Sequence, residues 1–249
     1  MNSSQYSFER PDGPVVMRPS WKHLLFLHWK VDPSQVQRLL PEGLEVDCFE
    51  GKAYIGLVPF VMENVRPHFI PNLGRFGHWY QNFAELNVRT YVTCNGVPGV
   101  WFFSLDAAST PAVLTARAWF NLPYFRARMR FWKDRDGAYR YWSKRLWPRP
   151  TPATCSVRYR VEGQAAPAQP GSLEQFLVER YMLYSQRGNK LFRGRVHHHP
   201  YQMQSARLEH WRQNCVQAAG FPSPTTAPHV VYARGVDVEI WGLEECRKL

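Results

Sequence analysis

Asn95-Gly96 separates two alternating runs, Glu85-Leu86-Asn87-Val88-Arg89-Thr90-Tyr91-Val92 and Gly99-Val100-Trp101-Phe102-Phe103-Ser104-Leu105-Asp106. This pattern is the strongest short-range signal for a β-hairpin, because both central residues of a type I′ turn need a positive φ. With Asn95 and Gly96 as the turn, the strands pair Tyr91 with Val100 and Arg89 with Phe102. The same register continues to Asn87 opposite Ser104 and Glu85 opposite Asp106.

Polar side chains gather on one face of this predicted hairpin, since side chains alternate along each strand. The face carries Glu85, Asn87, Arg89, Tyr91, Ser104 and Asp106. Directly opposed carboxylates repel, so Glu85 and Asp106 must be solvated, share a proton or be bridged by an arginine. The face is either the solvent side of a sheet or, with Phe102 on the same side, the polar interior of a closed barrel. Alternation alone leaves both interpretations open.

Further elements are expected on both sides of the hairpin. Strands are predicted at 21–31, 53–60, 126–131, 139–144, 154–161 and 229–241, with Asp136-Gly137 as a second hairpin turn. Helices are predicted after the cap Asp32, from Ser109 to Phe120, from Ser172 to near Gly188, and from Gln204 to Ala219. The Pro- and Gly-rich stretch 66–77 is expected to be a loop that covers a pocket mouth. Without repeats or a linker, residues 1–249 are expected to form one domain.

The chain carries a formal net charge of +11, which attracts phosphate without sequence recognition. Most of its 31 basic residues are arginines spread along the chain, and it has no basic tail. Arginine is suited to bidentate pairing with carboxylates and to stacking on aromatic rings, which make up 15% of the residues. No zinc finger, helix-turn-helix or aromatic RNA-binding motif accompanies the charge, so nucleic acid is not the expected partner.

Cysteine spacing and the N-terminus bear on the compartment. The cysteines form an odd set without a C-x-x-C pair: Cys48, Cys94, Cys155, Cys215 and Cys246. This pattern suggests neither a disulfide framework nor a zinc cluster. The first residues lack a basic region followed by an apolar run, and the apolar stretches are only as long as strands. We therefore expect a cytoplasmic protein that does not span a membrane, with homo-oligomer formation left open.

Histidine side chains can serve as metal ligands or as catalysts. His28 shares a strand face with apolar residues, where a histidine is more often part of the core than a catalyst. In His197-His198-His199, consecutive side chains point to opposite faces of a strand, and no carboxylate with ligand spacing adjoins them. No metal site is predicted. Glu179, Arg180 and Tyr184 are explained by a surface network on the predicted helix.

Several motifs, in the same order, resemble the uncharacterised YqjF-like family of the acetoacetate decarboxylase-like superfamily. Besides the two hairpin runs, they are Leu25-Phe26-Leu27-His28-Trp29, Leu39-Leu40-Pro41-Glu42-Gly43-Leu44-Glu45-Val46-Asp47, Gly56-Leu57-Val58-Pro59-Phe60, Leu122-Pro123-Tyr124-Phe125, Glu179-Arg180-Tyr181, Leu183-Tyr184 and His198-x-Pro200. The resemblance covers nearly the whole chain. It implies a mostly β (α+β) fold, a closed antiparallel barrel with a ligand cavity and a few flanking helices.

The resemblance also limits the chemistry. In the decarboxylases a lysine just beyond the strand equivalent to Val100–Asp106 forms a Schiff base. Here Ala112 and Val113 occupy that region, and no lysine lies between Lys52 and Lys133. Schiff-base decarboxylation is therefore not expected unless another lysine reaches the cavity. No cofactor is expected either.

Two functions remain open after the resemblance. The first is an enzyme, lyase-like or hydrolase-like, acting on a small anionic or carbonyl-bearing molecule; the second is a non-catalytic binding or sensory barrel. In the enzyme, Glu85, Asp106 and His28 are the candidate catalytic groups. The candidate substrate-binding groups are Arg89, Asn87, Tyr91, Ser104, Glu179 and His198.

Overall fold

The computed structural model describes residues 9–65, 82–148 and 151–246. The predicted loop at 66–77 lies outside these residues. The strands are β1 (Val15–Met17), β2 (Ser20–Val31), β3 (Glu45–Val46), β4 (Ala53–Glu63), β5 (Phe83–Cys94), β6 (Val97–Ala107), β7 (Tyr124–Lys133), β8 (Tyr139–Trp147), β9 (Thr154–Ala166), β10 (Met182–Arg187), β11 (Lys190–His198), β12 (Met203–Gln213) and β13 (His229–Glu245). The helices are α1 (Pro33–Gln37), α3 (Thr110–Trp119), α4 (Leu173–Val178) and α5 (Cys215–Ala218).

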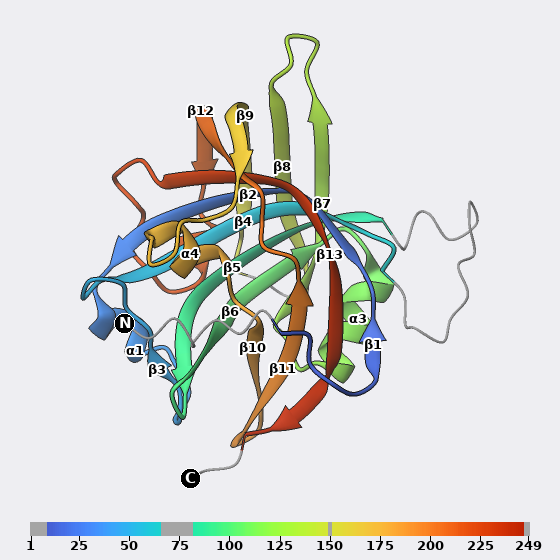
Figure 1. Ribbon diagram of the computed structural model, residues 1–249. Helices are drawn as coiled ribbons and strands as arrows, with labels where there is room; N and C mark the ends of the chain where they lie inside the picture. The colour runs from blue at the N-terminus through green and yellow to red at the C-terminus, as the bar shows by residue number, and fades with distance from the viewer. Residues whose placement is uncertain (1–8, 66–81, 149–150, 247–249) are drawn as a thin grey trace.

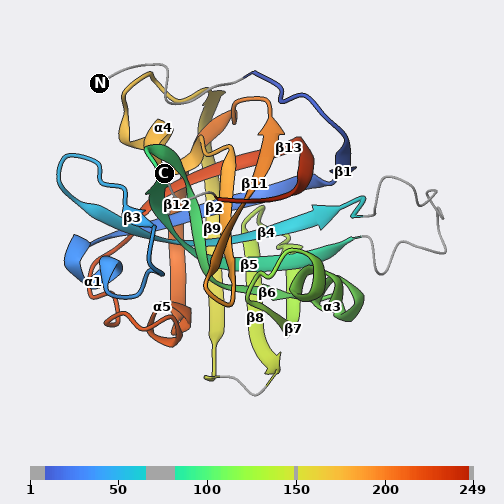
Figure 2. The ribbon, with the colours of Figure 1, turned by 90° about the horizontal axis from the view of Figure 1, so that it is seen from below.

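The described strands belong to one mostly antiparallel sheet (Figure 1). Its pairings form a ring that runs β11, β10, β6, β5, β4, β2 and β13 and returns to β11. A second series, β7, β8, β9 and β12, connects β6 to β13 by another route. Figure 2 shows β13, β2, β4, β5 and β6 following one another across the molecule, and these strands are common to both circuits. The chain is mostly β, as predicted.

Among the shared strands, β2, β4 and β5 are buried on both faces over most of their length, which explains the long apolar runs of β2 and β4. One face of β2 contributes Leu24 and Phe26 to a core that includes α3 and β11 residues. The other face contributes Leu25 and Leu27 to a second core, which lies against β8, β9 and α5. The two cores are thus separated by the β2, β4 and β5 wall.

The β5–β6 hairpin forms with the predicted turn, but its register changes part of the way along. Asn95 and Gly96 have φ values of 51° and 75°, and Arg89 pairs with Phe102 as predicted. A β-bulge between Val88 and Arg89 then places an extra residue in β6. Beyond it Glu85 pairs with Ala107, and Asp106 pairs with Leu86. The prediction that Glu85 and Asp106 face each other was wrong, because one extra residue moves every later side chain of β6 to the other face.

Three predicted helix starts are confirmed by their caps. Asp32 accepts a hydrogen bond from the Ser34 amide at 2.8 Å, and Ser109 caps α3. Ser172 accepts from the Gln175 amide at 3.2 Å. This third helix nevertheless ends at Val178, so the predicted extension to Gly188 was wrong. Residues 182–187 form β10, whose hydrogen bonds to β6 and β11 outweigh the local helix preference.

The predicted helix from Gln204 to Ala219 was also wrong. Most of this segment is β12, which pairs with β9 and β13, and only the short α5 follows. A register irregularity between Leu208 and His210 interrupts the alternation of buried and exposed residues. The spacing of Leu208, Trp211 and Cys215 then imitates the period of a helix, which explains the error.

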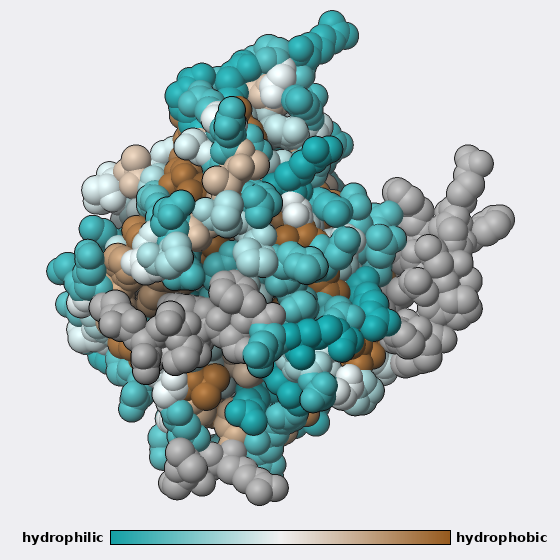
Figure 3. Space-filling model, viewed as in Figure 1, coloured by the Kyte–Doolittle hydropathy of each residue, from teal (hydrophilic) through white to brown (hydrophobic). Residues whose placement is uncertain are grey.

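Many arginines form ion pairs within the molecule, as the composition suggested. Arg158 and Arg160 both pair with Asp136 and Glu209 where β8, β9 and β12 lie side by side. The β7–β8 hairpin extends beyond the rest of the sheet in Figure 1. On the face seen in Figure 3, hydrophilic residues predominate and apolar residues form small groups between them. Within the described chain, no helix has the length and apolar character to cross a membrane.

Candidate functional site

A cavity of about 530 Å³ lies on the side of the wall that carries Leu24 and Phe60. Strands β2, β4, β5, β6, β11 and β13 contribute to its lining, and α3 covers it with the side of the helix that carries Ala112 and Ala116. Most of the lining is apolar. The ionisable lining residues are Glu85, Arg89, Tyr124, Arg180 and Tyr201, and none of the described lining residues is a lysine.

Arg89 is a buried charge at the cavity wall, with 8% of its surface exposed. Its Nη2 donates to the carbonyl oxygen of Leu177 at 3.0 Å and to the Tyr91 hydroxyl at 3.4 Å. Its guanidinium carbon also lies 5.4 Å from the centre of the Phe26 ring. Its Nε has no partner, and no ion pair joins Arg89 to a carboxylate in the part of the chain that the structure describes. Burial of an unpaired cation is costly, so a bound anion would complete this site.

His28 and Tyr91 lie behind Arg89 and hold it in place. The Tyr91 hydroxyl donates to the carbonyl oxygen of Leu177 at 2.7 Å, and its oxygen lies 2.6 Å from Nε2 of His28. Burial lowers the pKa of His28 well below its usual value, and the Arg89 charge lowers it further. A neutral His28 therefore donates to Tyr91 through Nε2. Gly56 makes this packing feasible, because a Cβ there would approach the His28 ring to 3.0 Å.

Glu85 lines the same cavity four residues before Arg89 on β5. Its Oε2 accepts a hydrogen bond from the Tyr124 hydroxyl at 3.0 Å. Burial raises the pKa of Glu85 to about 8, although the hydrogen bond from Tyr124 acts in the opposite direction. Asn87 lies between Glu85 and Arg89 on this face, and its Oδ1 is buried without a partner. β5 thus presents an acid that is neutral at pH 7, an amide and a cation in a row.

Ser104 and Asp106 do not line the cavity. Because of the bulge, Asp106 points into the second core, where its Oδ1 accepts from Nε of Arg145 at 2.7 Å. Both side chains are almost fully buried. Burial raises the pKa of Asp106 to about 6, against the effect of Arg145. The structure therefore separates Asp106 and Ser104 from Arg89, with which the sequence had grouped them.

Glu179 and His198 form a second buried polar group around Tyr201. Glu179 accepts from the Tyr201 amide at 3.0 Å and from the Tyr181 hydroxyl. Burial raises the pKa of Glu179 and lowers that of His198 to about 4. Nδ1 of His198 donates to the carbonyl oxygen of His199 at 2.8 Å, and the centres of the His198 and Tyr201 rings lie 4.5 Å apart with the ring planes tilted by 49°. Tyr201 itself lines the cavity, so this group forms part of the support of the wall.

Sequence reasoning missed Arg180 and Tyr124. Arg180 was assigned to a helix surface, yet it is buried, lines the cavity, and donates to Asp47 at 2.6 Å. Its guanidinium carbon lies 4.3 Å from the Phe176 ring and 5.0 Å from that of Tyr91. Tyr124 belongs to the motif Leu122-Pro123-Tyr124-Phe125, which was a signal for its importance without giving a role.

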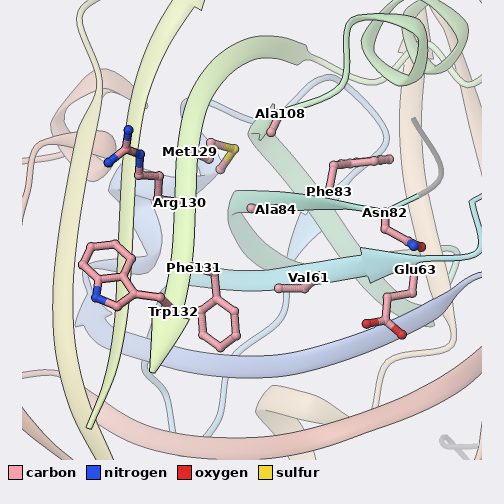
Figure 4. Close-up of a pocket in the computed structure, with 10 residues that line it drawn as sticks. All are labelled: Val61, Glu63, Asn82, Phe83, Ala84, Ala108, Met129, Arg130, Phe131 and Trp132. Atoms are coloured by element: carbon pink, nitrogen blue, oxygen red, sulfur yellow. The ribbon is translucent and has the colours of Figure 1, made fainter. Parts of the chain in front are cut away.

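A second, shallower hollow lies on the outside of the sheet near the ends of β4, β5 and β7 (Figure 4). It is larger, about 760 Å³, and its polar side chains, Glu63, Asn82 and Arg130, are partly or well exposed. Figure 4 shows Arg130 pointing away from Glu63 and Asn82. The hollow therefore lacks the converging buried groups of the cavity. Over the described residues, no three His, Cys, Asp or Glu side chains gather as a metal site would require.

Comparisons with known proteins identify the family and agree with the fold. The family model DUF2071, described as an uncharacterized conserved protein, matches residues 18–237. The uncharacterized protein YqjF of Bacillus subtilis (strain 168) is 40% identical over 241 residues, which are 97% of each chain. The enduracididine biosynthesis enzyme MppR complexed with pyruvate has a TM-score of 0.64 at 13% identity, covering 93% of this chain and 91% of MppR. Acetoacetate decarboxylase from Legionella pneumophila has a TM-score of 0.59 at 11% identity, covering 98% and 94% of the two chains. At these identities the structural neighbours establish the fold alone.

Proposed function

We propose that this chain, which belongs to the DUF2071 family of uncharacterized conserved proteins, is an enzyme acting on a small carboxylate inside a closed β-barrel. The observation that carries the proposal is Arg89, a buried cation at the cavity wall without a carboxylate partner among the described residues. Arg180 does not compensate it, because Arg180 is a second cation and is paired with Asp47. A bound carboxylate would supply the missing charge, and the guanidinium matches its geometry.

Glu85 is the proposed acid–base group. Its neutral form can donate a proton to a carbonyl oxygen of the ligand, and Tyr124 holds the carboxyl in place. Desolvation brings the pKa of Glu85 to about 8, close to the range in which a side chain can both give and take a proton at neutral pH. His28 supports Arg89 through Tyr91 and has no direct place in this chemistry.

The proposed chemistry does not use a Schiff base. The decarboxylases of the same fold require a lysine amine, and no lysine is among the described lining residues. MppR, which shares the fold, is described in complex with pyruvate. This neighbour supports a carboxylate that also carries a carbonyl group as the ligand class. The free state of all five cysteines supports the proposed cytoplasmic location.

Native mass spectrometry of the purified protein tests the proposal. The wild-type protein should retain a small acid, or bind added pyruvate or acetoacetate, and Arg89→Met should abolish retention while the protein stays folded. Arg89→Lys keeps the charge and should retain part of the binding. Arg207→Met, which removes an exposed arginine paired with Glu162, is the matched control and should change nothing. An unchanged adduct in Arg89→Met contradicts the proposal.

A further inference from the structure

The polar groups of the cavity follow one strand, and this arrangement restricts the ligand. Glu85, Asn87 and Arg89 lie at alternate positions of β5, so the Cα atoms of Glu85 and Arg89 are about 13 Å apart. Arg89 lies at one end of this row and donates to the carbonyl oxygen of Leu177, which belongs to the last turn of α4. Glu85 lies at the other end, beside Tyr124 at the start of β7. A ligand that contacts both Arg89 and Glu85 must therefore be elongated, with its negative charge at the Arg89 end.

Most of the remaining lining is apolar and comes from the other strands and from α3. β2 and β4 contribute Leu24, Val58, Phe60 and Met62, and β6 contributes Val100, Phe102 and Leu105. Val196 of β11 and Ile240 of β13 continue the wall, and α3 adds Ala112 and Ala116. A short acid bound at Arg89 would leave most of the 530 Å³ next to these side chains unfilled. Such apolar space is poorly hydrated and favours a hydrocarbon group.

We propose that the ligand is an amphipathic monocarboxylate, with its carboxylate at Arg89 and an apolar chain or ring system extending along the wall toward Glu85. This inference rests on the proposed function and specifies its substrate class. A neutral carbonyl or hydroxyl oxygen far from the carboxylate would be the part of the ligand that meets Glu85 and Tyr124. Short acids such as pyruvate would bind at the same arginine with much lower affinity.

The test is calorimetry with straight-chain carboxylates from butanoate to decanoate. Each added methylene should lower the Kd about fourfold until the cavity is filled, because burial of one CH₂ group contributes roughly 0.8 kcal/mol. Arg89→Met should raise the Kd of every member by a similar factor, at least tenfold, and leave the dependence on chain length in place. The carboxylate and the chain are thereby tested separately.

Two substitutions on α3 test where the apolar chain of the ligand lies. Ala116→Phe fills the cavity from the side of the helix that lines it. This substitution should abolish the increase in affinity that acids longer than the short ones show. Ala118→Phe adds the same ring on the exposed side of the same helix and should bind like the wild-type protein. If Ala116→Phe does not fold, Ala112→Leu makes a smaller addition to the same wall and should weaken octanoate and decanoate at least tenfold.

The outcomes separate this inference from the proposed function. If no carboxylate binds the wild-type protein, the proposed function itself is wrong. If carboxylates bind through Arg89 but with equal affinity at every chain length, the proposed function stands and the amphipathic ligand is wrong. Unchanged binding of decanoate to a folded Ala116→Phe variant also overturns the inference.

Discussion

Glu85→Gln should change how the stability of the protein depends on pH. The side chain is 2% exposed, and its pKa in the folded protein is about 8, against 4.5 without the protein environment. Below pH 4.5 the carboxyl is neutral in both states, and its burial costs little. As the pH rises toward 8, the unfolded chain gains by ionising while the folded protein cannot, so stability is lost over this window.

The size of the loss in folding stability follows from the difference between the pKa of Glu85 in the folded and unfolded states. Each pH unit within the window is worth about 1.4 kcal/mol, so wild type should lose roughly 3 to 4 kcal/mol between pH 4.5 and 7 and about 5 kcal/mol by pH 8 through this group. Glutamine keeps the shape and still accepts from the Tyr124 hydroxyl, but it does not ionise. The stability of Glu85→Gln relative to wild type should therefore increase by several kcal/mol over the same range.

Urea denaturation at half-unit pH steps measures this difference. Other titrating groups, Asp106 included, remain in both proteins and largely cancel in the comparison. Glu45→Gln, at an exposed position on β3, controls for the loss of one negative charge. If the difference between Glu85→Gln and wild type is constant from pH 4.5 to 8, Glu85 is not a buried neutral acid and its proposed catalytic role has no basis.

Three further predictions concern other parts of the molecule. Asp106→Ala leaves Arg145 buried without its partner and should cost about 3 to 5 kcal/mol in urea denaturation, whereas a loss below 1 kcal/mol would mean that the pair is solvated. Gly56→Ala forces a Cβ to within 3.0 Å of the His28 ring, and it should lower the free energy of unfolding by about 1 to 3 kcal/mol and weaken carboxylate binding. Gly242→Ala, whose Cβ would have its nearest contact at 3.8 Å, is the control, and equal effects of the two substitutions would contradict the packing argument. Duplex DNA of arbitrary sequence should bind weakly and dissociate at moderate salt in a gel-shift assay, because many arginines are internally paired; sub-micromolar, salt-tolerant binding would disprove this.

The β-rich fold could be predicted because its determinants are local. Asn95-Gly96 specifies its own turn, and alternation in Glu85–Val92 and Gly99–Asp106 specifies two strands. Caps at Asp32, Ser109 and Ser172 place helix starts for the same reason. The turn and the helix starts named here therefore depend on only a few neighbouring residues.

The predictions were wrong where contacts with distant parts of the chain determine the strand register or the secondary structure. No turn residue in the sequence indicates the bulge opposite Val88 and Arg89. The bulge nevertheless moves Asp106 from the predicted face into contact with Arg145. The segments 182–187 and 203–213 become strands because partners far along the chain bind them, against their local helical spacing. Arg180 was predicted to lie on a helix surface because the predicted helix included both Arg180 and the segment 182–187. Glu85, Asn87 and Arg89 were grouped correctly because they lie on one strand and need only the alternation of that strand.

A crystal structure of the protein grown with octanoate would show whether a carboxylate binds at Arg89 inside the cavity. We expect the carboxylate to lie within hydrogen-bonding distance of the Arg89 guanidinium, with the apolar chain of the ligand against Phe60, Leu105 and the inner side of α3. It would be contradicted by a structure in which Arg89 points into bulk water, or in which the carboxylate binds elsewhere and leaves the cavity empty.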